Sequence, residues 1–169
     1  MNIDRDSKEA IEFINSLEAA GFLGWPIDFE PTELNRFDAS SWFENSIEEY
    51  EKHRFLEFGK DGTGSGFCLW FYPGLERKPP VVFWSSEGEF CFVSDTLRDF
   101  VRQLCSGKLF YDGSWLDPDD EDRKEIDWED LKQRAINYFG AWLKSPKELE
   151  EEGRKNHPDF EKWVNEHWE

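Results

Sequence analysis

Between residues 54 and 105, short apolar runs alternate with clusters of Gly, Pro and Asp, and this alternation restricts the chain to few folds. The runs cover residues 55–58, 67–72, 81–84 and 90–93, and they are rich in aromatic and β-branched side chains. Short runs of this kind, bounded by turn residues, are typical of β-strands joined by hairpins. The sequence therefore predicts a largely antiparallel sheet of about four to six strands, with 67–72 in its centre.

Helical periodicity surrounds this strand region. The first predicted helix has an apolar face between a cap at Asp6 or Ser7 and a stop at Gly21. A second follows Ser40 or Ser41 to about residue 53, and a third begins at Ser94 or Asp95. Further helices are predicted from Asp127 to 142, from 146 to 153 and from 159 to 168. Residues 27–40 are predicted as a loop or short strand, and residues 109–116 as irregular.

These elements together predict an α+β fold in a single domain over residues 1–169, with helices packed on one side of the sheet. At 169 residues a chain can bury a sizeable core, and an aromatic content of 17% is not that of a disordered chain. The predicted core is residues 54–105. Residues 117–169 form an acidic helical extension that adds C-terminal helices.

The formal net charge of −18 restricts the kinds of molecule that the chain can bind. Such a surface repels nucleic acids and anionic membranes, whereas it attracts basic proteins; it also simply promotes solubility. The charge lies mainly in the flanks. Residues 54–116 hold 8 acids and 7 bases, whereas residues 117–169 hold 17 acids and 9 bases. The predicted sheet is thus nearly neutral, and the helical segments carry the negative field.

The densest acidic group is the candidate partner-binding site. It consists of Asp117, Asp119, Asp120, Glu121 and Asp122, to which we add Glu87 and Glu89 from a predicted turn. One interpretation is a docking patch for a Lys/Arg-rich partner. The alternative is a solvated loop that places negative charge ahead of a helix. Paired carboxylates could also serve a small hydrolase, but adjacent acids arise by chance in a chain with 38 of them.

Other residue patterns predict no cofactor, no metal and no catalytic residues. Gly62, Gly64 and Gly66 precede an aromatic strand rather than a helix, which favours a hairpin turn over a phosphate loop. The three cysteines lie in apolar runs or on a helix face without metal-ligand spacing, so we expect buried free thiols: Cys68, Cys91 and Cys105. Residues 1–9 lack the apolar run of a secretory signal, and we expect a cytoplasmic protein.

Four blocks follow one another in the middle of the chain, a turn, two strands and a helix: Phe58-Gly59-Lys60-Asp61-Gly62, Phe67-Cys68-Leu69, Pro80-Val81-Val82 and Ser94 to Phe100. Their order resembles the SUKH superfamily, the cell-wall-assembly-regulator-like domain. They cover roughly the middle third of the chain. The resemblance implies an α+β fold with helices on one side of the sheet, and it supplies no catalytic residues.

The resemblance also implies a class of function. Many bacterial members of this superfamily are immunity proteins that neutralise toxins of polymorphic or contact-dependent systems. We therefore expect a non-enzymatic immunity protein whose acidic surface covers a basic toxin, such as a nuclease. The alternatives are the carboxylate-pair hydrolase and an interaction scaffold without a toxin partner. The sequence leaves the oligomeric state open.

Overall fold

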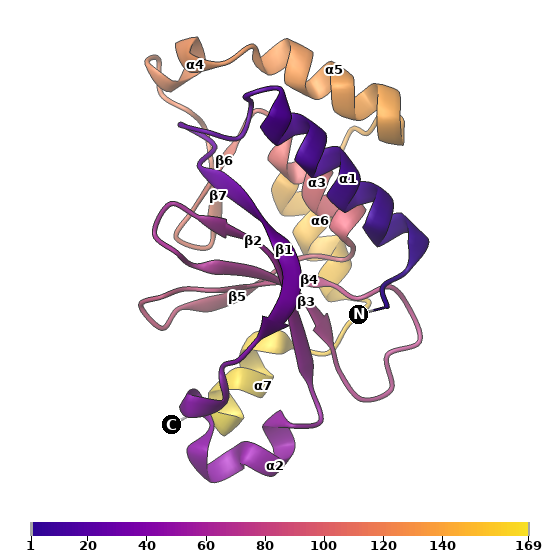
Figure 1. Cartoon of the computed structure of the whole chain (residues 1–169), viewed down its shortest axis with the longest axis vertical. Coiled ribbons are helices and arrows are strands. Elements are labelled where there is room, and N and C mark those ends of the chain that lie inside the picture. Colours follow the sequence, from indigo (N-terminus) through magenta and orange to yellow (C-terminus); the bar gives the residue numbers. More distant parts are fainter. Residues whose placement is uncertain (1, 169) are drawn as a thin grey trace.

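The computed structural model describes residues 2–168, and its centre is an antiparallel five-stranded sheet with the order β1-β2-β3-β4-β5 (Figure 1). The strands are β1 (Phe29–Phe37), β2 (Arg54–Asp61), β3 (Gly66–Phe71), β4 (Val81–Trp84) and β5 (Phe90–Ser94). Met1 and Glu169, the ends of the predicted domain, lie outside the described residues. The predicted α+β class and antiparallel sheet are confirmed, as is the central position of β3.

Strand β1 corrects the prediction of a loop or short strand over residues 27–40. It runs for nine residues at the edge of the sheet, and its register with β2 shifts between Pro31 and Asn35. Proline lacks an N–H group, so it is tolerated on an edge strand or at a bulge. Proline and scattered acids are usually signs of a loop, so they obscured this strand in the sequence. An edge strand can accommodate both.

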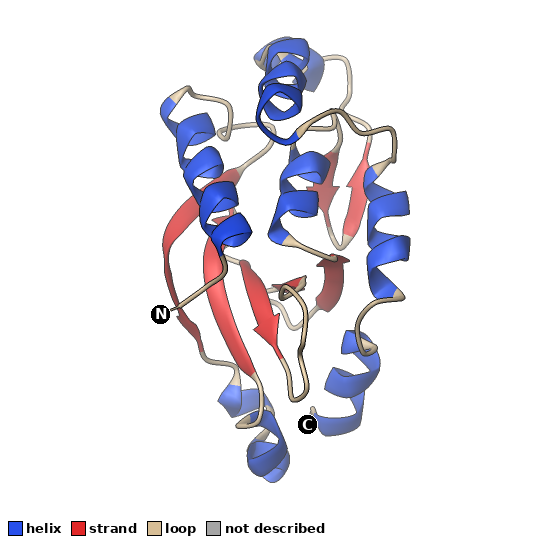
Figure 2. Ribbon diagram, turned by 90° about the vertical axis from the view of Figure 1, so that its right-hand side faces the viewer, coloured by secondary structure: helices blue, strands red, loops and turns tan. Residues whose placement is uncertain are grey.

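Helices cover both faces of the sheet, which corrects the expectation that they pack on one side (Figure 2). On one face lie α1 (Arg5–Ala19), α3 (Leu97–Leu104) and, above them, α5 (Trp128–Phe139). On the other face lie α7 (Phe160–His167) and residues 39–50, which include the short α2 (Ile47–Tyr50). Helix α6 (Pro146–Arg154) packs beside β5 and α3, and α4 (Asp122–Glu125) is a single turn.

Several helix boundaries differ from the predicted ones. Asp4 rather than Asp6 or Ser7 caps α1, and Thr96 rather than Ser94 or Asp95 caps α3. The predicted helix after Ser40 is broken into two 3-10 turns and the four-residue α2. The predicted starts of α5, at Asp127, and of the last two helices are confirmed. Several polar residues that could serve as caps precede α1 and α3, so periodicity alone did not choose among them.

The alternation of side chains along the strands explains why both faces are covered. Phe55 and Trp70 point towards α7, whereas their neighbours Leu56 and Leu69 point towards α1 and α3. All four residues are at most 1% exposed. A strand that is apolar at successive positions must be buried on two faces. The uninterrupted apolar runs in the sequence therefore required two layers of cover.

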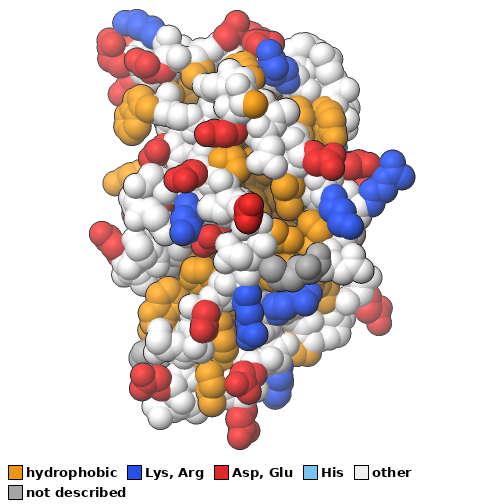
Figure 3. Space-filling model, in the orientation of Figure 1, with side chains coloured by type: hydrophobic (Ala, Val, Ile, Leu, Met, Phe, Trp, Pro, Cys, Tyr) orange, Lys and Arg blue, Asp and Glu red, His pale blue; other side chains and the backbone are white. Residues whose placement is uncertain are grey.

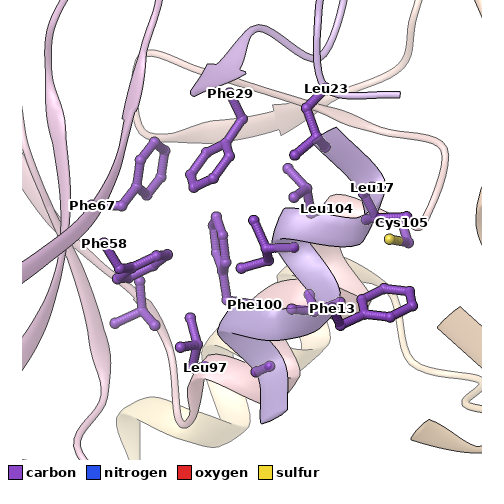
Figure 4. Close-up of a cluster of buried hydrophobic side chains, with 14 of the residues drawn as sticks. Phe13, Leu17, Leu23, Phe29, Phe58, Phe67, Leu97, Phe100, Leu104 and Cys105 are labelled. Atoms are coloured by element: carbon purple, nitrogen blue, oxygen red, sulfur yellow. The ribbon is translucent and has the colours of Figure 1, made fainter. Parts of the chain in front are cut away.

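Phe100 of α3 is the centre of the first core (Figure 4). Its ring centroid lies 5.6 Å from Phe29, 5.4 Å from Phe58 and 5.2 Å from Phe67, and Phe100 has no exposed surface. Tilted and edge-on aromatic contacts at these distances stabilise a core beyond their buried area. Phe100 thus joins α3 to three strands at once.

Phe160 of α7 has the corresponding position in the second core. Its ring centroid lies 5.1 Å from Trp70 and 5.3 Å from Trp84, and both tryptophans are buried. The side chain of Glu161 accepts a hydrogen bond from the backbone N–H of Phe92, on β5, at 3.0 Å. Arg154 donates two hydrogen bonds to the same carboxylate. Helix α7 is therefore held on the sheet in two ways. Its apolar face packs against Trp70 and Trp84, and its Glu161 side chain is hydrogen-bonded to β5.

His53, which lies just before β2 and is 7% exposed, also contacts the second core. Trp70 Nε1 donates a 2.9 Å hydrogen bond to His53 Nδ1, and the imidazole stacks on Trp163 at 4.0 Å. Burial lowers the pKa of His53 to about 4, although the nearby Glu49 carboxylate opposes this shift. The imidazole is therefore neutral at pH 7, as its acceptor role at Nδ1 requires.

We predict that Phe160→Ala destabilises the protein by about 3–5 kcal/mol, because it leaves a cavity between two buried tryptophans. Urea unfolding followed by circular dichroism measures the loss. Lys162→Ala on the same helix is the control, since the Lys162 side chain is 69% exposed. The control should change stability by less than about 0.5 kcal/mol. A loss below about 1 kcal/mol for Phe160→Ala would contradict the docking of α7.

We also predict an acid-dependent loss of stability that comes from His53. The unfolded chain binds a proton at His53 near pH 6.5, and the folded chain only near pH 4. Between these values the unfolded state holds more protons, so the free energy of unfolding falls as the pH drops from 6.5 to 4. Denaturant midpoints at pH 7, 6, 5 and 4 measure the effect. His53→Asn keeps an acceptor without titrating, so it should lose less stability over this window; equal losses would refute the assignment.

Candidate partner-binding surface

A β-hairpin lies where the sequence analysis predicted irregular chain, between residues 109 and 116. It pairs β6 (Leu109–Tyr111) with β7 (Ser114–Leu116) through a turn at Asp112 and Gly113. Both turn residues have positive φ, 49° and 77°, as a tight two-residue hairpin turn requires. The Asp-Gly pair between short apolar runs is the signal that could have revealed this hairpin.

The two faces of this hairpin have different environments. Phe110 and Trp115 point inwards, and the Phe110 ring lies 5.3 Å from Phe67 and 5.0 Å from Phe83. On the outward face Tyr111 is 70% exposed and Leu116 is 48% exposed. The hairpin is thus anchored in the first core while it presents apolar side chains to solvent.

The predicted acids of 117–122 follow the base of this hairpin. Asp117 accepts a hydrogen bond from Lys108 at 2.9 Å, which lowers the pKa of Asp117. Asp119 accepts one from the backbone N–H of Asp122, at the start of α4. Glu121 forms an ion pair with Lys124 at 3.1 Å. These acids are mostly exposed, and Asp117 and Glu121 each form an ion pair with a nearby lysine.

Glu87 and Glu89 lie elsewhere, in the turn between β4 and β5. The structure brings Glu89 to Asp112, at the tip of the hairpin, rather than to the 117–122 segment. Hydrogen bonding with the Asp112 carboxyl, and then the negative charge of Asp112, raise the pKa of Glu89. Asp112 was not among the predicted site residues. Its position in an Asp-Gly turn was visible in the sequence, but its contact with Glu89 was not.

Together these residues form one surface, which we call the acidic hairpin surface. Glu87, Glu89 and Asp112 lie at the tip end, and Asp117 and Asp120 at the base end. Tyr111 and Leu116 lie between the two ends. Among residues 2–168, no Lys, Arg or His side chain forms an ion pair with Glu87, Glu89, Asp112 or Asp120. Figure 3 shows acidic side chains gathered beside α4, with apolar side chains next to them.

The turn at Gly62, Gly64 and Gly66 is a β-hairpin connection between β2 and β3, as predicted. The Asp61 carboxylate accepts hydrogen bonds from the backbone N–H groups of Thr63 and Ser65 at 2.9 and 3.0 Å. These donors are therefore satisfied within the turn. Gly64 has a φ of 84°, which favours glycine at that position.

The three cysteines are free thiols, as predicted. Cys68 and Cys105 are fully buried, whereas Cys91 is only half-buried. Burial raises the pKa of the Cys105 thiol to about 12 and also raises that of Cys91. A thiol with a raised pKa holds little of the reactive thiolate at neutral pH.

One hydrogen-bonded chain has the composition of a catalytic relay. Asp95 Oδ1 lies 2.6 Å from His157 Nε2, and Tyr72 Oη lies 3.0 Å from His157 Nδ1. The His157 side chain has no exposed surface, and both of its nitrogens are engaged. This imidazole joins the ends of β3, β5 and α6, and it has no nitrogen left for a substrate. Its geometry is that of a structural link.

A cavity between the hairpin and the first core has a volume of about 10 Å³, enough for one water molecule.

Over residues 2–168, no group of three or more His, Cys, Asp and Glu side chains could hold a metal ion. Within the same residues, every helix is too short or too polar to cross a lipid bilayer. Comparison with protein-family models, with curated proteins and with solved structures gives no match.

We predict that Asp112→Asn returns the pKa of Glu89 towards its usual value. Asp112 supplies both the hydrogen bond and the largest charge effect on Glu89, and asparagine tolerates the positive φ of this turn. A pH titration of the Glu89 side-chain carboxyl by NMR measures the change. Glu87→Gln is the control, because Glu87 makes the smallest contribution to the shift, and its effect should be slight. A Glu89 pKa unchanged by Asp112→Asn would contradict the contact.

Proposed function

We propose that the chain is a non-enzymatic binding protein of the immunity type, which neutralises a basic protein toxin in the cytoplasm. The toxin belongs to a bacterial polymorphic or contact-dependent system, as the resemblance to the SUKH superfamily implies. The observation that carries the proposal is the acidic hairpin surface, where four carboxylates form no ion pair with any Lys, Arg or His of residues 2–168. Such a surface attracts basic proteins over a long range.

A toxin that cleaves nucleic acid must bind its substrate in order to act. A nuclease holds its phosphate substrate in a cleft lined with Lys and Arg. A strongly acidic protein competes for that cleft, and opposite charge accelerates the encounter between the two proteins. With a net charge of −18, this chain has the charge for rapid capture of a basic partner. Inhibition then needs only coverage of the cleft and no chemistry by the chain.

Affinity capture from lysates of the native cell tests this proposal. The immobilised full chain should retain a basic protein, and its release should require raised salt because charge drives association. When produced alone in a bacterial host, that protein should arrest growth, and co-production of the chain should restore growth. Retention that is indifferent to salt, or a captured protein that is not toxic, would contradict the proposal.

Two sets of substitutions locate the binding face. Glu87→Gln, Glu89→Gln, Asp112→Asn and Asp120→Asn remove charge from the acidic hairpin surface, and we expect association with the captured protein to slow by about tenfold or more at low salt. The matched control removes four exposed glutamates elsewhere: Glu18→Gln, Glu33→Gln, Glu44→Gln and Glu48→Gln. Surface plasmon resonance compares the two. Equal slowing by both sets would show that only net charge matters and would remove the hairpin from the proposal.

A further inference from the structure

The outward face of the β6–β7 hairpin carries two exposed apolar side chains, and a third, Leu109, packs against the first core. In its register Leu109 pairs with Leu116 and Tyr111 with Ser114, so Leu109, Tyr111 and Leu116 share one face. Tyr111 is 70% exposed and Leu116 is 48% exposed. Exposed apolar neighbours surrounded by polar groups are typical of protein interaction sites.

We propose that this face anchors the complex with the basic partner. Tyr111 and Leu116 enter an apolar depression on the partner, and the acids at the two ends of the hairpin contact Lys and Arg side chains that flank the depression. The inference rests on the proposed function, and it adds the residues that hold the partner and the shape of the surface that they fit.

The construction of the hairpin favours such a role. Its inner face is fixed by Phe110, whose ring contacts Phe67 and Phe83 at 5.3 and 5.0 Å, and by the Phe110–Trp115 contact at 5.2 Å. The outer face is therefore held in one orientation before a partner arrives. A pre-ordered anchor loses little conformational freedom on binding, and tyrosine is enriched among the residues that dominate interface energies.

The spacing between the acids at the two ends of the hairpin predicts where basic side chains lie on the partner. From Gly113 at the tip to Asp117 at the base is four strand steps, or about 13 Å. This separation exceeds the Debye length of about 8 Å at physiological salt, so the two acidic ends attract cations largely independently. A matching partner offers two basic clusters with an apolar region between them. A second copy of this chain does not fit, because acids would face acids.

Binding of the purified captured protein to paired variants tests the inference. Tyr111→Ala with Leu116→Ser should weaken the affinity by roughly tenfold to a hundredfold, mainly through faster dissociation. The salt dependence of association should stay as in the unmodified chain, because no charge is removed. Tyr138→Ala with Leu143→Ser is the matched control, since these side chains are 49% and 101% exposed on another part of the surface. The control should bind as the unmodified chain does.

A photo-crosslinking amino acid at position 111 gives an independent readout. It should join the chain to the captured protein, whereas the same group at position 138 should not. If the Tyr111 and Leu116 variant binds normally while the four-acid variant does not, the anchor is wrong and the proposed function stands. If both variants bind normally, or if the full chain captures no basic protein, both proposals fail.

Discussion

The structure depends on the burial of a short antiparallel sheet on both of its faces. Because β3 and β4 are apolar at nearly every position and β2 buries side chains from Phe55 to Phe58 in succession, neither face can be left to solvent. Helices α1 and α3 cover one face, and α7 with residues 39–50 covers the other. The C-terminal segment is therefore part of the core, since Phe160 fills the space between Trp70 and Trp84. An acidic sequence thus folds around an interior made largely of aromatic side chains.

The burial of the sheet on both faces determines which side chains remain on the surface. Most large rings are used in the two cores, and the excess of carboxylates remains outside. The β6–β7 hairpin differs because it is anchored by Phe110 and Trp115 yet exposes Tyr111 and Leu116. Its tip also brings Asp112 close to Glu89, which raises the pKa of the Glu89 carboxyl.

The candidate site could be predicted only in part. The acids of 117–122 and the Glu87–Glu89 turn were visible as local charge, and both lie on the surface. Their relation to one hairpin was not visible, because the sequence pattern predicts irregular chain over residues 109–116. The contact between Glu89 and Asp112 joins two turns that are 23 positions apart, and no local pattern encodes that distance. Tyr111 and Leu116 have the same apolar character as Phe110 and Trp115, so composition alone could not separate anchor from core.

The sequence by itself determined the α+β class, the strands β2 to β5, the central place of β3 and the apolar face of α7, since these follow from side-chain periodicity and turn residues within short windows. Only the tertiary structure decided that helices cover two faces, that residues 29–37 form an edge strand, and that His53 accepts a hydrogen bond from Trp70. It also decided which acids lie together. Such facts depend on contacts between distant segments, which local periodicity does not record.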